Sequence, residues 1–205
     1  MWHYLAFLRS PMSTALSPRV FSARRSFFSF LGPEFRFFAP DGSLALFVKQ
    51  KAFRLKEEIT AFRDEAKSQP VLRIQARNIL DIRATYDVTD AATGEKIGSC
   101  KRQGLKSILR DTWEVNSADD TLVGTLMEDS LVLALIRRFL LKAWLPQGFT
   151  LTAPDGKILG KLKQRFNPFI ITYDADFGAD EPGAIDTRLA TAATVLLLAI
   201  EGRQK

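Results

Sequence analysis

The sequence has almost none of the residues on which most enzyme active sites depend. Its 205 residues include one histidine, His3, and one cysteine, Cys100. With its only histidine near the start of the chain, a Ser/His/Asp or Cys/His triad is not expected. A single cysteine excludes an internal disulfide framework and a cysteine-rich metal site, and the Gly-rich P-loop and dinucleotide fingerprints are missing. We therefore expect the protein not to be an enzyme.

Acidic residues are absent from the first 33 residues, which hold Arg9, Arg19, Arg24 and Arg25. Of the formal net charge of +6, +4 lies in this segment, so the rest of the chain is close to neutral. A near-neutral body argues against nucleic acid as a partner. We expect residues 1–33 to be a basic leader or flexible tail and residues 34–205 to form one domain. In a eukaryote the leader composition would indicate mitochondrial targeting; otherwise we expect a cytoplasmic or peripheral membrane protein.

No apolar run is long enough to cross a membrane. The longest stretch of apolar or small residues, Leu189 to Ile200, has twelve residues, whereas a bilayer requires about 20. Asp186 or Thr187 can cap the start of a helix here, and Gly202 can end it. A helix that is apolar on all sides is either buried or in a membrane, and its length favours burial. We therefore predict a buried C-terminal helix from about Asp186 to Glu201.

Short runs of strand-forming residues, separated by turn formers, fill the chain between Phe35 and Ala175. Alternation is clearest at Leu72, Ile74 and Ala76, which would share one face of a sheet. Pro40-Asp41-Gly42 and Pro154-Asp155-Gly156 favour tight turns. The expected strands are Phe35–Phe38, Leu44–Gln50, Glu58–Asp64, Pro70–Arg77, Ala84–Asp90, Lys96–Gln103, Asp111–Ser117, Leu122–Asp129, Gly148–Ala153, Lys157–Arg165 and Phe169–Ala175.

A weak internal repeat of 26 residues relates these runs. Leu72, Gly98 and Gly124 are separated by this step, and short segments such as Lys51-Ala52-Phe53 recur with it after a strand. A repeating two-strand unit indicates successive hairpins of one meander. Because eleven strands would leave long edges in an open sheet, we expect a closed antiparallel β-barrel. Small residues such as Gly98, Gly124 and Gly160 would leave room inside it for the C-terminal helix.

A second helix is expected from Ser130 to Trp144, as an insertion in the hairpin series. Its helical spacing places apolar residues on one face and Arg137, Arg138 and Lys142 on the other. This composition is typical of an interfacial membrane helix, and it equally fits an amphipathic helix packed on the barrel. The candidate membrane-contact residues are Arg137, Arg138, Phe139, Lys142 and Trp144.

Several short motifs resemble those of a known group. They are Val48-Lys49-Gln50-Lys51-Ala52-Phe53, Tyr86-Asp87-Val88-Thr89-Asp90 followed by Thr93-Gly94-Glu95, and Asp174-Ala175-Asp176-Phe177-Gly178 before the apolar helix. In this order they resemble the phospholipid scramblase and LURP-one-related families of the tubby C-terminal-like superfamily, over about Phe35 to Glu201. The resemblance implies a mainly β protein, a barrel of about twelve strands around a hydrophobic C-terminal helix. One strand is then missing from the eleven runs.

The resemblance also implies a class of function. Scramblases are proposed to move phospholipids, and tubby proteins bind phosphoinositides, so an anionic phospholipid membrane is the expected partner. The LURP-one relatives leave open a soluble scaffold barrel that binds an unidentified protein. The cysteine-rich palmitoylation segment of animal scramblases is absent here, which argues against anchoring by lipidation.

In scramblases an acidic segment before the last helix is proposed to bind Ca²⁺. The matching candidates are Asp174, Asp176, Asp180, Glu181 and Asp186, whose carboxylates suit a hard cation. Their spacing is not that of an EF-hand loop, and Gly178-Ala179 replaces a bulkier family stretch. The alternative is a solvated acidic loop in which Asp186 caps the helix.

Overall fold

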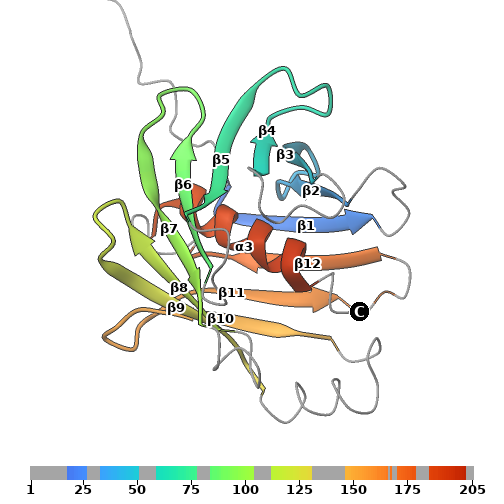
Figure 1. The fold of residues 1–205 in the computed structure, drawn as a ribbon. Helices are drawn as coiled ribbons and strands as arrows, with labels where there is room; N and C mark the ends of the chain where they lie inside the picture. Colours follow the sequence, from blue (N-terminus) through green and yellow to red (C-terminus); the bar gives the residue numbers. More distant parts are fainter. Residues whose placement is uncertain are drawn as a thin grey trace, which may run out of the picture.

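A computed structural model shows a closed barrel of twelve antiparallel strands around one helix (Figure 1). It describes residues 18–26, 33–50, 59–77, 84–103, 112–130, 146–165, 167, 170–178 and 185–201. The strands are β1 (Val20–Ser26), β2 (Glu34–Phe38), β3 (Leu44–Lys49), β4 (Ile59–Phe62), β5 (Pro70–Ala76), β6 (Thr85–Asp90), β7 (Lys96–Arg102), β8 (Thr112–Ser117), β9 (Leu122–Glu128), β10 (Gly148–Thr152), β11 (Ile158–Arg165) and β12 (Ile170–Asp176). The helix α3 (Thr187–Glu201) runs through the middle of the ring of strands. The predicted fold class and all eleven predicted strands are confirmed.

The barrel is an up-and-down meander closed by its first and last strands. Each strand pairs with its neighbours in sequence, and β1 pairs with both β2 and β12. Strands β5, β7 and β9 begin at residues 70, 96 and 122, so the 26-residue step corresponds to one hairpin of the meander. Closure leaves no strand edge unpaired, which removes the usual risk of edge-to-edge association.

Strand β1 is the one that the sequence analysis missed. It lies inside the segment expected to be a leader, so residues 20–26 belong to the barrel and the expected boundary at residue 34 does not hold for them. Phe21 and Ala23 are buried, whereas Arg24 is exposed. The strand therefore has one buried and one outward face, but its two arginines give it the composition of a basic leader.

Two Pro-Asp-Gly turns have the same construction. In each, the glycine N–H donates to the carbonyl oxygen of the preceding alanine at 2.9 Å, and the aspartate carboxylate accepts the N–H two residues later. Gly42 and Gly156 have φ of 83° and 88°, a left-handed conformation that glycine adopts without strain. The predicted turns are confirmed at both positions.

Helix α3 begins with a capping interaction and is buried from Leu189 to Ala199. The backbone N–H of Arg188 donates to Asp186 Oδ1 at 2.8 Å, as expected of an N-cap residue. The buried hydroxyls of Thr191 and Thr194 donate to carbonyl oxygens one turn earlier, at 2.8 and 3.0 Å, so neither is left unsatisfied. The stretch Val195 to Leu198 has at most 2% of its surface exposed, which confirms the predicted burial.

Of the three glycines expected to make room for the helix, only Gly98 does so. A Cβ on Gly98 would lie 3.0 Å from two methyl carbons of Leu189 in α3 and even closer to the Asn116 carbonyl oxygen. The nearest atoms to a Cβ on Gly124 belong to Thr152, Leu151 and Leu159, and on Gly160 to Phe177 and Asp176. The expectation is wrong for Gly124 and Gly160, because those two positions accommodate other parts of the barrel.

The insertion expected to be a helix, residues 130–144, lies outside the described residues from position 131 onward. So do most of the leader and the segment Lys51-Ala52-Phe53 of the repeat. The tight turns described above, and those after β4, β6 and β8, all lie at one end of the barrel. The last residues of β3, β5, β7 and β9 and the first residues of β4, β6, β8 and β10 lie at the other end.

Cys100 is expected to be unreactive in the folded protein. Its side chain faces the core from β7 with 0% exposure, and burial raises the pKa of the thiol to about 12. Because the thiolate is the reactive species, the thiol should not react with Ellman's reagent until the protein unfolds. Labelling at neutral pH with and without urea tests this. Rapid labelling of the native protein would contradict the burial of this residue.

Candidate functional site

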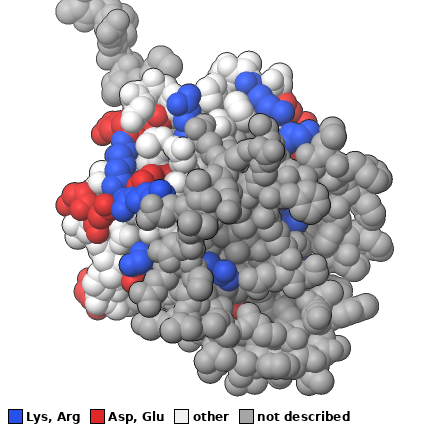
Figure 2. Space-filling view, in the orientation of Figure 1, with Lys and Arg blue, Asp and Glu red and all other residues white. Residues whose placement is uncertain are grey.

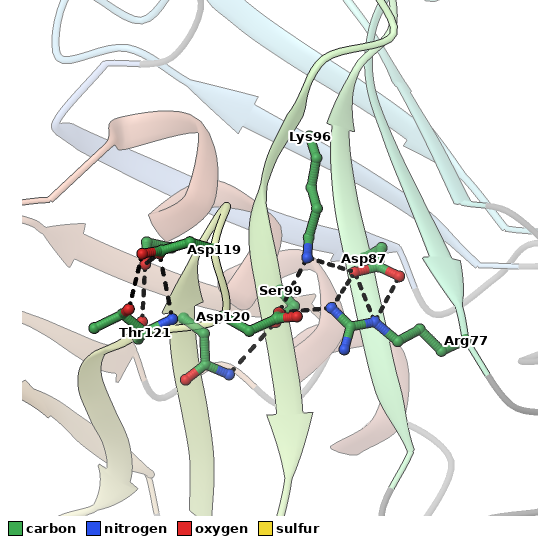
Figure 3. Close-up of polar contacts among 9 residues, drawn as sticks. Arg77, Asp87, Lys96, Ser99, Asp119, Asp120 and Thr121 are labelled. Carbon is green, nitrogen blue, oxygen red and sulfur yellow. Dashed lines mark hydrogen bonds and ion pairs between the residues drawn. The ribbon is translucent and has the colours of Figure 1, made fainter.

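Among the described residues, a connected polar cluster lies on the outer face of the barrel from β5 to the β8–β9 turn, and its serine, Ser99, is fully covered. It consists of Arg77, Asp87, Lys96, Ser99 and Asp120, called here the outer charge network (Figure 3). Arg77 directly follows β5, Asp87 is on β6, Lys96 and Ser99 are on β7, and Asp120 is in the β8–β9 turn. Residues far apart in the chain meet here because the meander places these strands side by side.

Arg77 joins two carboxylates in this network. Its Nε lies 2.7 Å from Asp87 Oδ2, and its Nη2 lies 2.7 Å from Asp87 Oδ1, so the pair is bidentate. The same Nη2 lies 2.6 Å from Asp120 Oδ1. Bidentate guanidinium–carboxylate pairs fix orientation as well as distance. Arg77 is therefore held in one position between β6 and the β8–β9 turn.

Asp120 Oδ1 accepts three hydrogen bonds. Besides Arg77, the donors are Lys96 Nζ at 3.1 Å and Ser99 Oγ at 3.0 Å. Asn116 Nδ2 on β8 donates in turn to Ser99 Oγ at 3.4 Å. These bonds hold the pKa of the Asp120 carboxyl far below its usual value, with Arg77 the largest cause and Lys96 the next. The hydrogen bond to Asp87, and then that to Asp120, raise the pKa of Arg77.

Acid is expected to weaken the fold partly through Asp120. Because its pKa is lowered in the folded protein, the unfolded chain binds the extra proton, and stability falls as pH drops below about 5. The urea midpoint measured as a function of pH should therefore fall less steeply for Asp120→Asn than for the native protein. Parallel pH curves for the two proteins would contradict this role.

A second polar cluster anchors the start of α3. Arg188 Nη1 lies 3.0 Å from Asp90 Oδ2 at the end of β6, and Arg188 Nη2 lies 2.7 Å from Asp186 Oδ2. Burial alone would raise the pKa of Asp90, but hydrogen bonds from Ala92, Thr93 and Arg188 together lower it. Asp90 therefore ties the β6–β7 turn to the helix, and the Tyr86–Asp90 motif has a structural role at its last residue.

The candidate calcium ligands are in part committed to other partners. Asp174 on β12 receives two hydrogen bonds from Arg165 on β11, at 2.5 and 2.6 Å, and Asp186 is held by Arg188. Asp176 lies at the exposed end of β12, while Asp180 and Glu181 are outside the described residues. Over the part of the chain that the structure describes, no three acidic, histidine or cysteine side chains form a group that could hold a metal ion.

The candidate membrane-contact residues are not placed by the structure. Arg137, Arg138, Phe139, Lys142 and Trp144 all lie in residues 131–145, outside the described ranges. Within those ranges no helix has both the length and the apolar character needed to cross a membrane.

Sequence reasoning did not find the outer charge network. Arg77 was expected only as the last residue of the strand Pro70–Arg77, and Asp120 falls between the expected strands Asp111–Ser117 and Leu122–Asp129. Its members lie up to 43 residues apart, and only the strand register brings them together. One signal was available in principle. Asp87 on β6 pairs directly with Ser99 on β7, so two polar side chains lie opposite each other on the outward face of the sheet.

Charges of both signs intermingle on this face of the molecule. Figure 2 shows basic and acidic side chains beside each other at the left of the view, over β6, β7 and β8. The outer charge network contains two cations and two anions, so its formal charges balance. Attraction of an anion to this site would thus depend on the arrangement of donors rather than on a broad basic surface.

The chain is similar to a known protein family. The family model described as LURP-one-related matches residues 44–198, from the start of β3 to near the end of α3. A comparison with curated proteins finds no match.

Proposed function

The chain belongs to the LURP-one-related family, and from that premise we propose that it binds anionic phospholipid at a membrane surface through the outside of its barrel, without catalysing a reaction. The resemblance of its motifs to those of scramblases supports lipid as the class of partner. Transport of lipid between leaflets is not part of the proposal.

The filled interior favours binding on the outside. Val195, Leu196 and Leu197 of α3 have no exposed surface, and they share one buried core cluster with large side chains such as Phe35, Phe37 and Trp113. Protein interiors are close-packed, so the described core is filled by the protein's own side chains, and an acyl chain could enter it only by displacing them. A lipid headgroup would have to be held by outward-facing side chains or by the connections between strands.

The observation that carries the proposal is the convergence of three donors on Asp120 Oδ1. An arginine, a lysine and a serine hydroxyl from β5 and β7 meet at one anionic oxygen, at 2.6 to 3.1 Å. These are the side chains that bind phosphate in proteins, because charged donors make short and strong hydrogen bonds to its oxygens. The outer charge network can thus bind the phosphate of a headgroup.

Vesicle co-sedimentation of the full chain tests the proposal. We expect binding to phosphatidylcholine vesicles that contain phosphatidylserine and none to phosphatidylcholine alone. Binding should weaken from low to physiological salt, because each basic residue near an anionic surface contributes about 1 kcal/mol and this attraction is screened. Failure to sediment with the anionic vesicles at low salt would refute the proposal.

The same assay with calcium and with a chelator tests the calcium hypothesis for Asp174, Asp176, Asp180, Glu181 and Asp186.

The balance of surface charges favours a second candidate, a soluble scaffold that binds another protein. Arg36 is paired with Glu34 and Glu65, and Lys101 with Glu114, so much of the described basic surface is neutralised locally. A surface of this kind is less attracted to anionic lipid than one with free basic residues. Loss of a defined protein partner on Phe139→Asp, together with absent vesicle binding, would favour the scaffold.

A further inference from the structure

Asp120 occupies a turn position that is glycine in two equivalent turns. In the β2–β3 and β10–β11 turns this position is Gly42 and Gly156, and in the β8–β9 turn it is Asp120. The backbone N–H of Asp120 donates to the Ser117 carbonyl oxygen at 3.0 Å, as the glycine N–H groups do in the other two turns. Its φ is 62°, a left-handed conformation that residues other than glycine adopt at a cost.

The carboxylate of Asp120 is not needed to build this turn. The turn's side-chain hydrogen bonds are made by Asp119, which accepts from Ser117 Oγ at 2.5 Å and from Thr121 Oγ1 at 3.0 Å. Asp119 Oδ1 also accepts the backbone N–H of Thr121 at 3.4 Å, and Asp41 and Asp155, at the corresponding position of the other turns, likewise accept the N–H two residues later. The Asp120 side chain instead points away from its own turn, toward Arg77 and Lys96 (Figure 3).

Without Asp120, the donors of the network would have an unfilled position. Asp87 neutralises one of the two cations, and Arg77 Nη2, Lys96 Nζ and Ser99 Oγ would still converge on the point where Asp120 Oδ1 lies. A phosphate monoester carries between one and two negative charges near neutral pH and has three acceptor oxygens, so it can satisfy all three donors. A phosphodiester has a single charge and less capacity to displace the carboxylate.

We propose that Arg77, Lys96 and Ser99 form a binding site for a phosphate monoester, and that Asp120 is a tethered competitor that occupies this site until the ligand displaces it. The phosphate site itself does not depend on the proposed function. Only the source of the phosphate, a lipid headgroup rather than a free phosphate compound, rests on it. A competitor held on a short turn has a high effective concentration, so it lowers the apparent affinity without preventing binding.

The test compares four full-length proteins: the native chain, Asp120→Asn, Asp120→Gly and Asp119→Asn. Asp120→Asn removes the competing charge, and Asp120→Gly restores the residue found in the other two turns, so the turn itself should be preserved. Asp119→Asn removes the same charge one residue away and controls for the change in net charge. The probes are inorganic phosphate, titrated by calorimetry, and phosphatidylcholine vesicles containing phosphatidic acid or phosphatidylglycerol.

We expect both Asp120 variants to bind inorganic phosphate and phosphatidic acid vesicles about fivefold more tightly than Asp119→Asn, with a smaller gain for phosphatidylglycerol. Equal binding of Asp120→Asn, Asp120→Gly and Asp119→Asn to both probes would overturn the inference, even if the native chain binds vesicles. A gain for inorganic phosphate without any vesicle binding would support the anion site and refute the lipid proposal. Circular dichroism of each variant confirms that it is folded.

Discussion

Replacing Leu196 with alanine is expected to destabilise the protein by about 2–5 kcal/mol, the largest effect we expect of a conservative core substitution. Leu196 lies in the middle of α3 and has 0% exposure. Truncating it removes buried methyl groups and leaves a cavity that the surrounding strands cannot readily fill, because a closed barrel has little freedom to collapse. Urea unfolding followed by circular dichroism measures the change.

The matched control is Leu122→Ala, the same chemical change at a surface position. Leu122 is at the start of β9 with 40% exposure, so its truncation should change the free energy of unfolding by about 0.5 kcal/mol or less. Similar effects at the two leucines would mean that α3 does not fill the barrel.

Gly98→Ala is expected to destabilise the protein by about 1–3 kcal/mol or more. A Cβ on Gly98 would overlap the carbonyl oxygen of Asn116 on the neighbouring strand and would also press on Leu189 of α3. The carbonyl oxygen belongs to the sheet backbone, so relief requires the strands themselves to shift. The measurement is again the free energy of unfolding in urea.

Gly148→Ala separates this overlap from the general effect of adding a methyl group. A Cβ there would lie 2.5 Å from Asp129 Oδ2, the end of a side chain that can shift at the cost of its exposed hydrogen bond from Thr150 Oγ1, without movement of the sheet backbone. We expect a small change for Gly148→Ala and a large one for Gly98→Ala. If Gly148→Ala proved the more damaging of the two, the close approach of β7 to β8 and α3 would be wrong.

The strands and the helix were predictable because local patterns determine them. Alternation, Pro-Asp-Gly turns and the apolar run before Glu201 each reflect a local preference that the fold obeys. Strand β1 was missed because Arg24 and Arg25 give it the composition of a leader, although Phe21 and Ala23 alternate inward. The inward alternation in β1 extends over only a few residues, so the basic composition of the segment determined the prediction.

The outer charge network was not predictable in the same way. Arg77 and Asp120 meet only because β6, β7 and β8 lie in one register, and a slip of one residue would turn Ser99 to the opposite face of the sheet. Gly124 and Gly160 show the same limitation in the core. The sequence shows that these residues are small. It does not show whether the helix or a neighbouring strand lies beside each of them, because that depends on how the barrel closes.

The buried helix and the outward side chains have separate roles in this protein. The side chains of α3 fill the core of the barrel, so substitutions of outward side chains should change the stability much less than substitutions in the core. Asp120 illustrates this separation, since the turn that carries it is built by Asp119 and its own carboxylate serves only the network. The binding properties of the protein should thus be separable from its stability by substitution at the surface.

Binding of anionic vesicles by two charge-matched double variants tests most directly whether the outer charge network is the binding surface. Arg77→Gln/Lys96→Gln removes both cations of the network. Lys161→Gln/Lys163→Gln removes two exposed cations from β11, which is four strands from β7, the strand of Lys96. Loss of two specific contacts should weaken binding by about 2 kcal/mol, or roughly thirtyfold. We predict that loss for Arg77→Gln/Lys96→Gln and a several-fold smaller one for Lys161→Gln/Lys163→Gln. Equal losses, or a greater loss for the β11 variant, would contradict the assignment of lipid binding to this site.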